Sequence, residues 1–335
     1  MFNIHKFYSL KTKRETYENG GKLGLINKSS ICYLNSIVQC LSHTLPMTDA
    51  IFNFRDTIHT KDTLVYECFS TLLYKLWNGS FVLDAYSLMK TLKLSDNVQH
   101  DSHETLLKLL SCIHDGLKYK IQCNVKGEEL TESDILLRKG YEAWIKYFGN
   151  DYSFIIKNFY GDTITTYSCK CNEPIFEPFN NIMLPIDDSD DDIETSFTRY
   201  FQQSKCASCI KKKKKHHGTI DTEIWNLPDT FIITLKRFDN QGKKINKAVN
   251  FPFDLDMTRW VSKAKGDPNN YIYSLYAVNC HIGRCDNGHY WSYCKDIHGD
   301  WYKFDDTDTV KVNDMSNINT NSTAYILFYQ RVRIL

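Results

Sequence analysis

The sequence contains no long hydrophobic run, and the stretch from Ala324 to Tyr329 is among the longest that are purely apolar. A helix that spans a bilayer needs about 18 or more apolar residues, so we expect no membrane-spanning helix. Residues 1–21 are polar and lack the apolar segment that a secretory signal requires. We interpret them as an N-terminal leader and expect a protein that stays inside the cell without a membrane partner.

An excess of charge of one sign is also lacking, since 41 Lys and Arg face 40 Asp and Glu, a net charge of +1. Attraction of the whole chain to nucleic acid or anionic lipid is therefore not indicated. Two local runs, one acidic at residues 187–194 and one basic at 211–217, are typical of solvated loops. With 42% hydrophobic and 14% aromatic residues, the 335-residue chain is expected to bury a substantial core.

The chain has twelve cysteines. Inside a cell thiols are kept reduced, so disulfides are not expected. The cysteines are then core thiols, metal ligands or a nucleophile, and their spacing has to distinguish these roles.

Apolar residues recur with a helical period in the first part of the chain, from about Asn27 to Tyr147. Residues 34, 37, 38 and 41 fall at i, i+3, i+4 and i+7, which is one face of a helix. The same spacing returns at residues 69–76 and 106–113. This part of the sequence predicts a set of amphipathic helices.

After about Phe154, short runs rich in β-branched and aromatic residues are separated by turn-forming residues, as is typical of strands. The candidate strands are residues 163–168, 231–236, 272–278, 290–295, 301–304 and 324–330. The turn at residues 296–300 predicts a hairpin between the fourth and fifth of them. Helices followed by strands predict an α+β protein with a cleft between two lobes.

Cys32 stands immediately before the amphipathic stretch 33–41. A helix that starts there would direct free N–H groups and the positive end of its dipole at the sulfur. An environment of this kind activates a thiol as a nucleophile. On position alone an ordinary buried thiol is the commoner interpretation, and we adopt it for Cys40, Cys68 and Cys112.

A thiolate nucleophile needs a base, and the base needs an orienting group. His289 lies where a loop enters a predicted strand, and Asp305 and Asp306 follow the partner strand of the predicted hairpin. Two antiparallel strands joined by a short turn place His289 and Asp305 at the same end. His281 is the rival base, but we expect it within or just after a strand and prefer His289.

Six stretches of the chain, in order, resemble the conserved boxes of the ubiquitin-specific proteases. They are the cysteine box at residues 24–41, QHDSHE at 99–104, residues 227–238 and 249–257, the histidine box formed by GHY at 288–290 with WYKFDD at 301–306, and residues 324–329. The resemblance implies a papain-like cysteine protease fold in one catalytic domain, residues 22–331. A helical thumb would span about residues 24–150, and a β palm with zinc-ribbon-like β fingers about 151–331.

The resemblance also implies a role for each residue of the site. Cys32 would attack the carbonyl after the last glycine of ubiquitin, His289 would activate it, and Asp305 would orient His289. Asp306 would have a supporting role. Asn27 would donate to the oxyanion, a contact worth about 2.7–4 kcal/mol in the transition state; the alternative for Asn27 is an ordinary turn residue.

Two further residues are implied to contact the extended ubiquitin tail, and two more are assigned to substrate binding. Asp101 and Glu104 occupy the positions that grip this basic segment, and Gln99 and Tyr290 are assigned to the same substrate site. Asp101 and Glu104 also have the spacing of a capping box before a helix. Both interpretations hold together if that helix end faces the cleft.

The sequence departs from the family pattern just before the nucleophile. Where the family usually has Gly, Asn and Thr, this chain has Ser29, Ser30 and Ile31. A serine in place of glycine could tighten the loop that presents Asn27 and lower the activity. All three triad positions hold competent residues, so we predict an active enzyme, a thiol-dependent deubiquitinase.

Four cysteines form two close pairs, Cys169 with Cys171 and Cys206 with Cys209. Four thiolates that converge from two hairpins make a structural zinc site, which family members often carry in the fingers. Because the first pair is one residue shorter than usual, His216 or His217 could replace one sulfur. The alternatives are free thiols left from a partly lost site, and a nucleic-acid module in which a zinc knuckle lies beside lysines 211–215.

The resemblance implies ubiquitin and ubiquitinated proteins as partners, no nucleic acid, a monomer, and a cytoplasmic or nuclear location. Two other functions stay open. A ubiquitin-binding scaffold without catalysis is supported only by the unusual residues 29–31. A protease for another ubiquitin-like modifier would keep the same chemistry, because recognition by shape is distributed over a surface that one sequence does not reveal.

Overall fold

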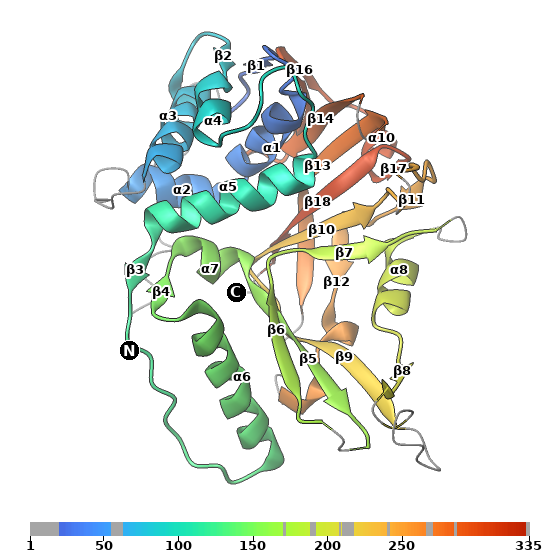
Figure 1. Ribbon diagram of the computed structural model, residues 1–335. Helices are drawn as coiled ribbons and strands as arrows, with labels where there is room; N and C mark the ends of the chain where they lie inside the picture. Colours follow the sequence, from blue (N-terminus) through green and yellow to red (C-terminus); the bar gives the residue numbers. More distant parts are fainter. Residues whose placement is uncertain are drawn as a thin grey trace. The chain divides into compact units, whose positions relative to one another are not determined.

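The computed structural model describes residues 20–54, 63–169, 172–187, 192–207, 209, 218–239, 242–265, 271–284 and 287–332. These residues form two compact units. The first unit joins the chain up to Gly116 with Tyr276–Met315, and the second joins Leu117–Leu275 with the chain from Ser316 onward. Each unit is therefore built from segments that are distant in the sequence (Figure 1).

The helices of the first unit follow the predicted apolar spacing. They are α1 (Cys32–Ser42), α2 (Leu45–Phe54), α3 (Leu64–Asn78), α4 (Tyr86–Thr91) and α5 (Ser102–Leu117), with a short parallel pair of strands, β1 (Leu25–Ile26) and β2 (Leu83–Asp84). The apolar positions predicted in α1, α3 and α5 are all buried. Every residue of α1 is buried, so this helix lies wholly in the core.

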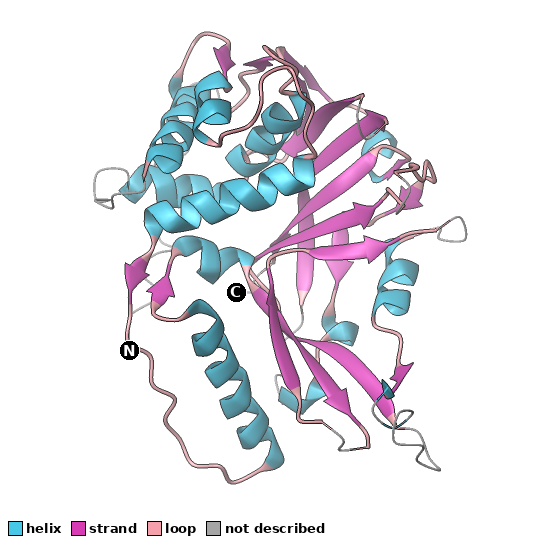
Figure 2. Ribbon diagram, viewed as in Figure 1, coloured by secondary structure: helices cyan, strands magenta, loops and turns pink. Residues whose placement is uncertain are grey.

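The first unit also contains an antiparallel sheet in the order β16-β15-β14-β13. Its strands are β13 (Ile272–Gly283, which enters the unit at Tyr276), β14 (Gly288–Lys295), β15 (Trp301–Asp305) and β16 (Asp308–Lys311). Figures 1 and 2 show α1 beside β14, against which it packs. The predicted hairpin is confirmed, since Lys295 pairs with Trp301 at its closed end.

The turn of this hairpin is closed by the side chain of Asp296. Its Oδ1 accepts hydrogen bonds from the backbone N–H groups of His298 and Asp300, both at 2.9 Å. Aspartate is favoured in turns for this reason, because its carboxylate satisfies backbone donors that the strands leave unpaired. The short turn sets the register of β14 against β15, and that register determines which side chains share a face.

The second unit holds most of the remaining strands. One antiparallel sheet has the order β6-β5-β9-β8, formed by β5 (Gly161–Tyr167), β6 (Ile175–Phe179), β8 (Ser204–Lys205) and β9 (Thr219–Asn226). Another group places β10 (Thr230–Lys236) between β7 (Ile182–Pro185) and β18 (Ala324–Arg331), and β12 (Asp254–Asp256) pairs with the start of β13. All six predicted strands are present, with ends shifted by a few residues.

The second unit also contains helices and short pairs. They are α6 (Glu132–Phe148), α7 (Phe154–Phe159), α8 (Ile193–Tyr200) and α10 (Ser316–Asn319), the 3-10 turns η3 (Thr258–Trp260) and η4 (Lys263–Lys265), and the strand pairs β3 (Tyr119–Lys120) with β4 (Asp151–Tyr152) and β11 (Val249–Asn250) with β17 (Thr320–Asn321). The prediction of a loop over residues 187–194 is wrong at its end, because Asp192 caps α8 through a hydrogen bond to the Thr195 N–H at 2.7 Å. The basic run 211–217 lies outside the described residues.

Within the described part of the chain, no helix combines the length and the apolar composition that crossing a bilayer requires. The ten cysteines that the structure describes are all free thiols. The predicted division at about residue 150 into thumb, palm and fingers stays a prediction, as does the boundary of the leader.

Candidate active site

Cys32 is the first residue of α1 and only 1% exposed. Ile31, which precedes the helix, makes no side-chain cap. The Leu34 N–H bonds to the Ile31 carbonyl at 2.9 Å, and the N–H groups of Cys32 and Tyr33 have no acceptor within the helix. The Cys32 side chain lies beside the imidazole of His289, and this interaction is the largest of those that act on the pKa of His289. The structure thus brings together two residues that are almost the whole chain apart.

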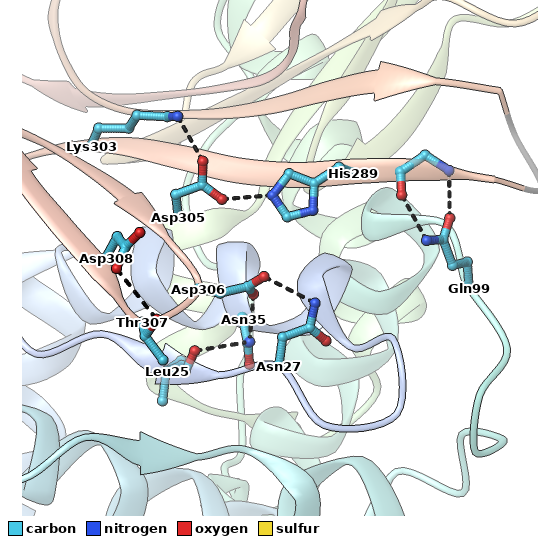
Figure 3. Close-up of polar contacts among 11 residues, drawn as sticks. Leu25, Asn27, Asn35, Gln99, His289, Lys303, Asp305, Asp306, Thr307 and Asp308 are labelled. Carbon is cyan, nitrogen blue, oxygen red and sulfur yellow. Dashed lines mark hydrogen bonds and ion pairs between the residues drawn. The ribbon is translucent and has the colours of Figure 1, made fainter.

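The other side of the imidazole faces a carboxylate. His289 Nε2 lies 2.6 Å from Asp305 Oδ1, and both side chains are partly exposed (Figure 3). The interaction with Cys32 and, after it, the hydrogen bond with Asp305 raise the pKa of His289 to about 9 against the opposing effect of burial. At neutral pH the imidazole is therefore positively charged, which is the state that stabilises a neighbouring thiolate.

The strand register explains why Asp305 meets His289. Tyr293 of β14 is paired with Lys303 of β15, and side chains alternate between the two faces of a sheet. His289 and Tyr293 therefore share one face of β14, and Lys303 and Asp305 share the same face of β15. Buried residues on the opposite face, Ser292 among them, alternate with these positions.

Lys303 is a fourth member of this arrangement. Its Nζ lies 2.6 Å from Asp305 Oδ2 and 5.2 Å from the centre of the Trp291 ring. In Figure 3 the Asp305 carboxylate lies between Lys303 and His289. Burial raises the pKa of Asp305, but the bonds from Lys303 and His289 outweigh this effect and hold that pKa below its ordinary value.

Asp306 points to a different set of partners. Its φ of 51° is left-handed, at the first position of the tight turn that joins β15 to β16, where Asp305 pairs with Asp308. Its carboxylate accepts hydrogen bonds from the amides of Asn27 and Asn35, both at 2.9 Å (Figure 3). Asp306 therefore connects the loop before Cys32, through Asn27, and α1, through Asn35, to the sheet. None of the described hydrogen bonds joins Asp306 to His289.

The orientation of the Asn27 side chain is fixed from both ends. Its Oδ1 accepts a hydrogen bond from the Ile31 N–H at 2.8 Å, and its Nδ2 donates to Asp306. An amide NH₂ has two hydrogens, so one remains after the bond to Asp306. This geometry suits a donor to an oxyanion and is more constrained than an ordinary turn residue needs.

The remaining predicted substrate residues lie around α5 and β14. Asp101 Oδ1 accepts hydrogen bonds from the N–H groups of His103 (2.6 Å) and Glu104 (3.2 Å), so the predicted helix cap is confirmed for Asp101, and the Glu104 side chain is exposed. Tyr290 is buried, with its ring centre 4.4 Å from that of His281. The Gln99 amide is bonded to the backbone of Gly288.

His281 is itself 1% exposed inside β13, in agreement with the preference for His289 as the base. A Cβ at Gly288 would lie 2.1 Å from His281 Nε2, so only glycine fits immediately before His289. The substrate roles of Asp101, Glu104, Gln99 and Tyr290 stay predictions.

Two residues of this network were missed from the sequence, Asn35 and Lys303. Asn35 is 3% exposed in a helix that is otherwise largely apolar, and a buried amide of this kind normally has a specific partner. Lys303 stands two residues before Asp305, which is the spacing of side chains on one face of a strand. Both signals were present, but neither identifies the partner.

A separate cluster of three thiols lies in the second unit. The sulfur atoms of Cys169, Cys206 and Cys209 lie within 4.8 Å of one another. Cys206 and Cys209 are buried, and their turn is closed by a hydrogen bond from the Cys209 N–H to the Cys206 carbonyl at 3.1 Å. Converging buried thiols are the donor set of a structural zinc site. The predicted ligand Cys171, and the alternatives His216 and His217, lie outside the described residues.

The sequence profile of the family described as "Ubiquitin carboxyl-terminal hydrolase" matches residues 23–329. The chain belongs to this family. Similar curated proteins include "Ubiquitin carboxyl-terminal hydrolase Usp2" of Drosophila melanogaster, which is 28% identical over 97% of this chain and 36% of its own length. "Ubiquitin carboxyl-terminal hydrolase 2" of Bos taurus is 29% identical over 92% of this chain and 55% of its own length. The chain spans about a third to a half of the length of these two relatives.

Solved structures of similar fold include "Structure of the SAGA Ubp8/Sgf11/Sus1/Sgf73 DUB module bound to ubiquitin aldehyde". That match has a TM-score of 0.72 at 20% identity and covers 95% of this chain and 71% of the other. At this identity the likeness shows the fold, which is the α+β papain-like fold of the ubiquitin carboxyl-terminal hydrolases.

The structure gives a physical reason for the family residues that this chain lacks before Cys32. Ser29 and Ser30 have φ values of 65° and 59°, both in the left-handed region. Glycine, and to a lesser degree asparagine, adopt this conformation readily, which matches the usual Gly-Asn of ubiquitin carboxyl-terminal hydrolases at these positions. The two serines keep the loop conformation at a cost in conformational energy.

We expect Ser29→Gly to raise the free energy of unfolding by about 1 kcal/mol, because glycine removes the Cβ that makes left-handed backbone unfavourable. Denaturant unfolding of the full chain measures the change. The matched control is Ser87→Gly, at an exposed position inside α4, where glycine should lower stability by about 0.5 kcal/mol. A loss of stability in Ser29→Gly would contradict the strain argument.

Proposed function

We propose that this chain is a deubiquitinating cysteine protease that hydrolyses the peptide or isopeptide bond after the C-terminal glycine of ubiquitin. The observation that carries the proposal is the continuous contact from Cys32 through His289 to Asp305, at the start of a buried helix. Membership of the ubiquitin carboxyl-terminal hydrolase family supports the same activity.

The reaction begins with Cys32 as a thiolate beside the His289 imidazolium. The sulfur attacks the glycine carbonyl, and the oxyanion that forms is stabilised by the remaining Asn27 N–H and by the backbone N–H of Cys32, which has no acceptor within the helix. His289 then protonates the leaving amine. Water, deprotonated by His289, attacks the thioester and expels the Cys32 thiolate, and the products are ubiquitin with a free carboxylate and the restored thiolate–imidazolium pair.

Asp305 keeps His289 in position throughout this cycle, with Nε2 directed at Asp305 and the other ring nitrogen left for Cys32. Asp306 supports Asn27 rather than the base. The fold match to a module bound to ubiquitin aldehyde supports ubiquitin as the partner. Asp101 and Glu104 would pair with its basic tail. We propose that the chain acts as a monomer in the cytoplasm or nucleus.

The test is covalent labelling of the full chain by ubiquitin that carries a C-terminal electrophile. Wild-type protein should gain the mass of one ubiquitin, and Cys32→Ala should gain none. Folded wild-type protein that binds ubiquitin without forming the adduct would show the scaffold alternative instead. Probes built on other ubiquitin-like modifiers, run in parallel, test whether ubiquitin is the preferred modifier.

We also propose that Cys169, Cys206 and Cys209, with Cys171 as the fourth ligand, hold one structural zinc ion. The convergence of the three described sulfur atoms and the burial of two of them support this assignment. When bound, the ion would link Cys169, which lies just after β5, to the Cys206–Cys209 turn. Its role would be structural, with no part in the reaction.

Purified protein should contain about one equivalent of zinc, and chelation should lower its unfolding temperature. Cys206→Ser should lose both the metal and this response to chelator, whereas Cys123→Ser, an exposed thiol outside the cluster, should keep both. Less than about half an equivalent of tightly bound zinc in wild-type protein would contradict the proposal.

A further inference from the structure

The side chain of Gln99 is bonded to both polar backbone groups of Gly288, the residue before His289. Its Nε2 donates to the Gly288 carbonyl at 2.6 Å, and its Oε1 accepts from the Gly288 N–H at 2.7 Å (Figure 3). This two-bond pattern is the one that a residue of a neighbouring antiparallel strand would provide. The amide of Gln99 thus acts as a one-residue extension of the sheet.

The extension fills a position that β15 does not reach. The register between β14 and β15 starts at Ser292 and Phe304, whereas β13 pairs with β14 as far as Gly288. The end of β14 that carries His289 is therefore held by β13 on one side. Gln99 supplies the hydrogen bonds on the other side.

Gly288, the residue that Gln99 holds, is also the residue whose backbone is intrinsically the most flexible. Glycine has the largest backbone freedom of any residue, and at position 288 no other residue fits beside His281. A flexible backbone next to the base lets the imidazole move unless something outside the strand restrains it. Both hydrogen-bonding groups of Gly288 are restrained in this structure by a single side chain.

Gln99 is well placed to restrain the backbone of Gly288, because the segment that follows Gln99 is anchored to α5 and β13. Asp101 caps α5, and Ser102 donates a hydrogen bond from its Oγ to Asn279 Oδ1 of β13 at 2.9 Å. Asn279 in turn donates from its Nδ2 to Ser36 Oγ of α1 at 2.8 Å. This buried chain of contacts connects the Gln99 segment to the helix that begins with Cys32.

We propose that Gln99 is a positioning residue that holds the backbone before His289 and thereby sets the imidazole against Cys32, rather than a residue that contacts substrate. The inference rests on the proposed protease function. It differs from the substrate role that the family resemblance implies, and the two roles have different kinetic signatures. Loss of a substrate contact raises KM, whereas misplacement of the base lowers kcat.

The experiment compares wild type, Gln99→Ala and Gln99→Glu in steady-state hydrolysis of a fluorogenic C-terminal amide of ubiquitin. For Gln99→Ala we expect kcat to fall by about 10–100-fold, since a displacement of about 1 Å costs that much, with KM within about threefold of wild type. Gln99→Glu should be intermediate, because a carboxylate still accepts from the Gly288 N–H but no longer donates to its carbonyl. Gln203→Ala, a glutamine bonded to Asp221 in the second unit, should behave as wild type.

A KM raised tenfold with kcat unchanged would overturn the proposal in favour of a substrate contact, and so would kinetics identical to wild type. Alkylation of Cys32 by iodoacetamide gives a second readout that needs no ubiquitin. Gln99→Ala should slow it near pH 7 without a change in unfolding temperature, and an unchanged rate would also overturn the proposal. If wild-type protein reacts with iodoacetamide but does not hydrolyse the ubiquitin amide, the proposed function fails, while the alkylation rates still decide the role of Gln99.

Discussion

Replacement of His289 by glutamine should lower kcat by about 10⁴-fold, the upper range of what a positioned acid–base group contributes. Glutamine is of similar size and polar, but it neither takes a proton from Cys32 nor gives one to a leaving amine. The side chain is 40% exposed, so the unfolding temperature should change little. Hydrolysis of the ubiquitin amide measures kcat, and probe labelling should slow in parallel.

The matched control is His298→Gln, at an exposed position in the turn of the same hairpin, which should keep wild-type activity. If His289→Gln kept more than about a tenth of the wild-type kcat, another group would have to be the base, and the contact between Cys32 and His289 would be without catalytic meaning.

His289 also sets the direction of the pH dependence. Its pKa is raised to about 9 in the folded protein from an ordinary value of 6.5, so the imidazolium form persists through neutral pH. The value of kcat/KM should fall as pH rises through about 9. The same group stabilises the fold fully below pH 6.5, and that contribution should be lost between pH 6.5 and about 9. His289→Gln should lose this segment of the pH–stability curve.

The second large effect is expected at Asp305. Asp305→Ala should lower kcat by about 10²-fold or more, because the imidazole loses the acceptor that fixes its orientation. Asp305→Asn should retain activity within about tenfold of wild type, since an amide oxygen still accepts from Nε2, as the asparagine does in papain-like Cys-His-Asn sites. Rescue of activity by asparagine would show that Asp305 acts mainly by orienting the imidazole and not through its negative charge.

Asp308→Ala serves as the control, because Asp308 is exposed on β16 and its carboxylate accepts a hydrogen bond from the Thr307 hydroxyl rather than from His289. Asp306→Ala should act differently from Asp305→Ala. It frees the amides of Asn27 and Asn35 and should lower stability as well as kcat. If Asp306→Ala abolished activity and Asp305→Ala did not, Asp306 would be the residue that orients the base.

The positions of helices and strands could be predicted because they depend on local periodicity. The apolar spacing in α1, α3 and α5 and the turn residues between β14 and β15 are properties of short segments. Cys32 at a helix start and His289 with Asp305 at one end of a hairpin follow from the same local rules.

Asp305 was expected to orient His289, but the hydrogen-bond partners of Asp306 could not be predicted from the sequence. Adjacent aspartates look alike until the backbone at Asp306 turns left-handed and sends its carboxylate to Asn27 and Asn35. The role of Lys303 was missed for a related reason, because which face of β15 meets His289 depends on a register set by the hairpin turn. Gln99 was assigned to substrate, since a sequence does not reveal that a side chain completes a sheet edge.

The helices and strands, the family, and the chemical identity of the nucleophile and base can be predicted from the sequence alone, because each depends on a short run of residues. The tertiary structure is needed to show that the β13–β16 segment joins the N-terminal helices in one unit. It is also needed to show where the Asp306 carboxylate points and what restrains the backbone beside the imidazole. These outcomes depend on strand register, one left-handed residue and contacts between segments nearly 200 residues apart (|i−j| of 189 for Gln99 and Gly288), and no local pattern encodes them.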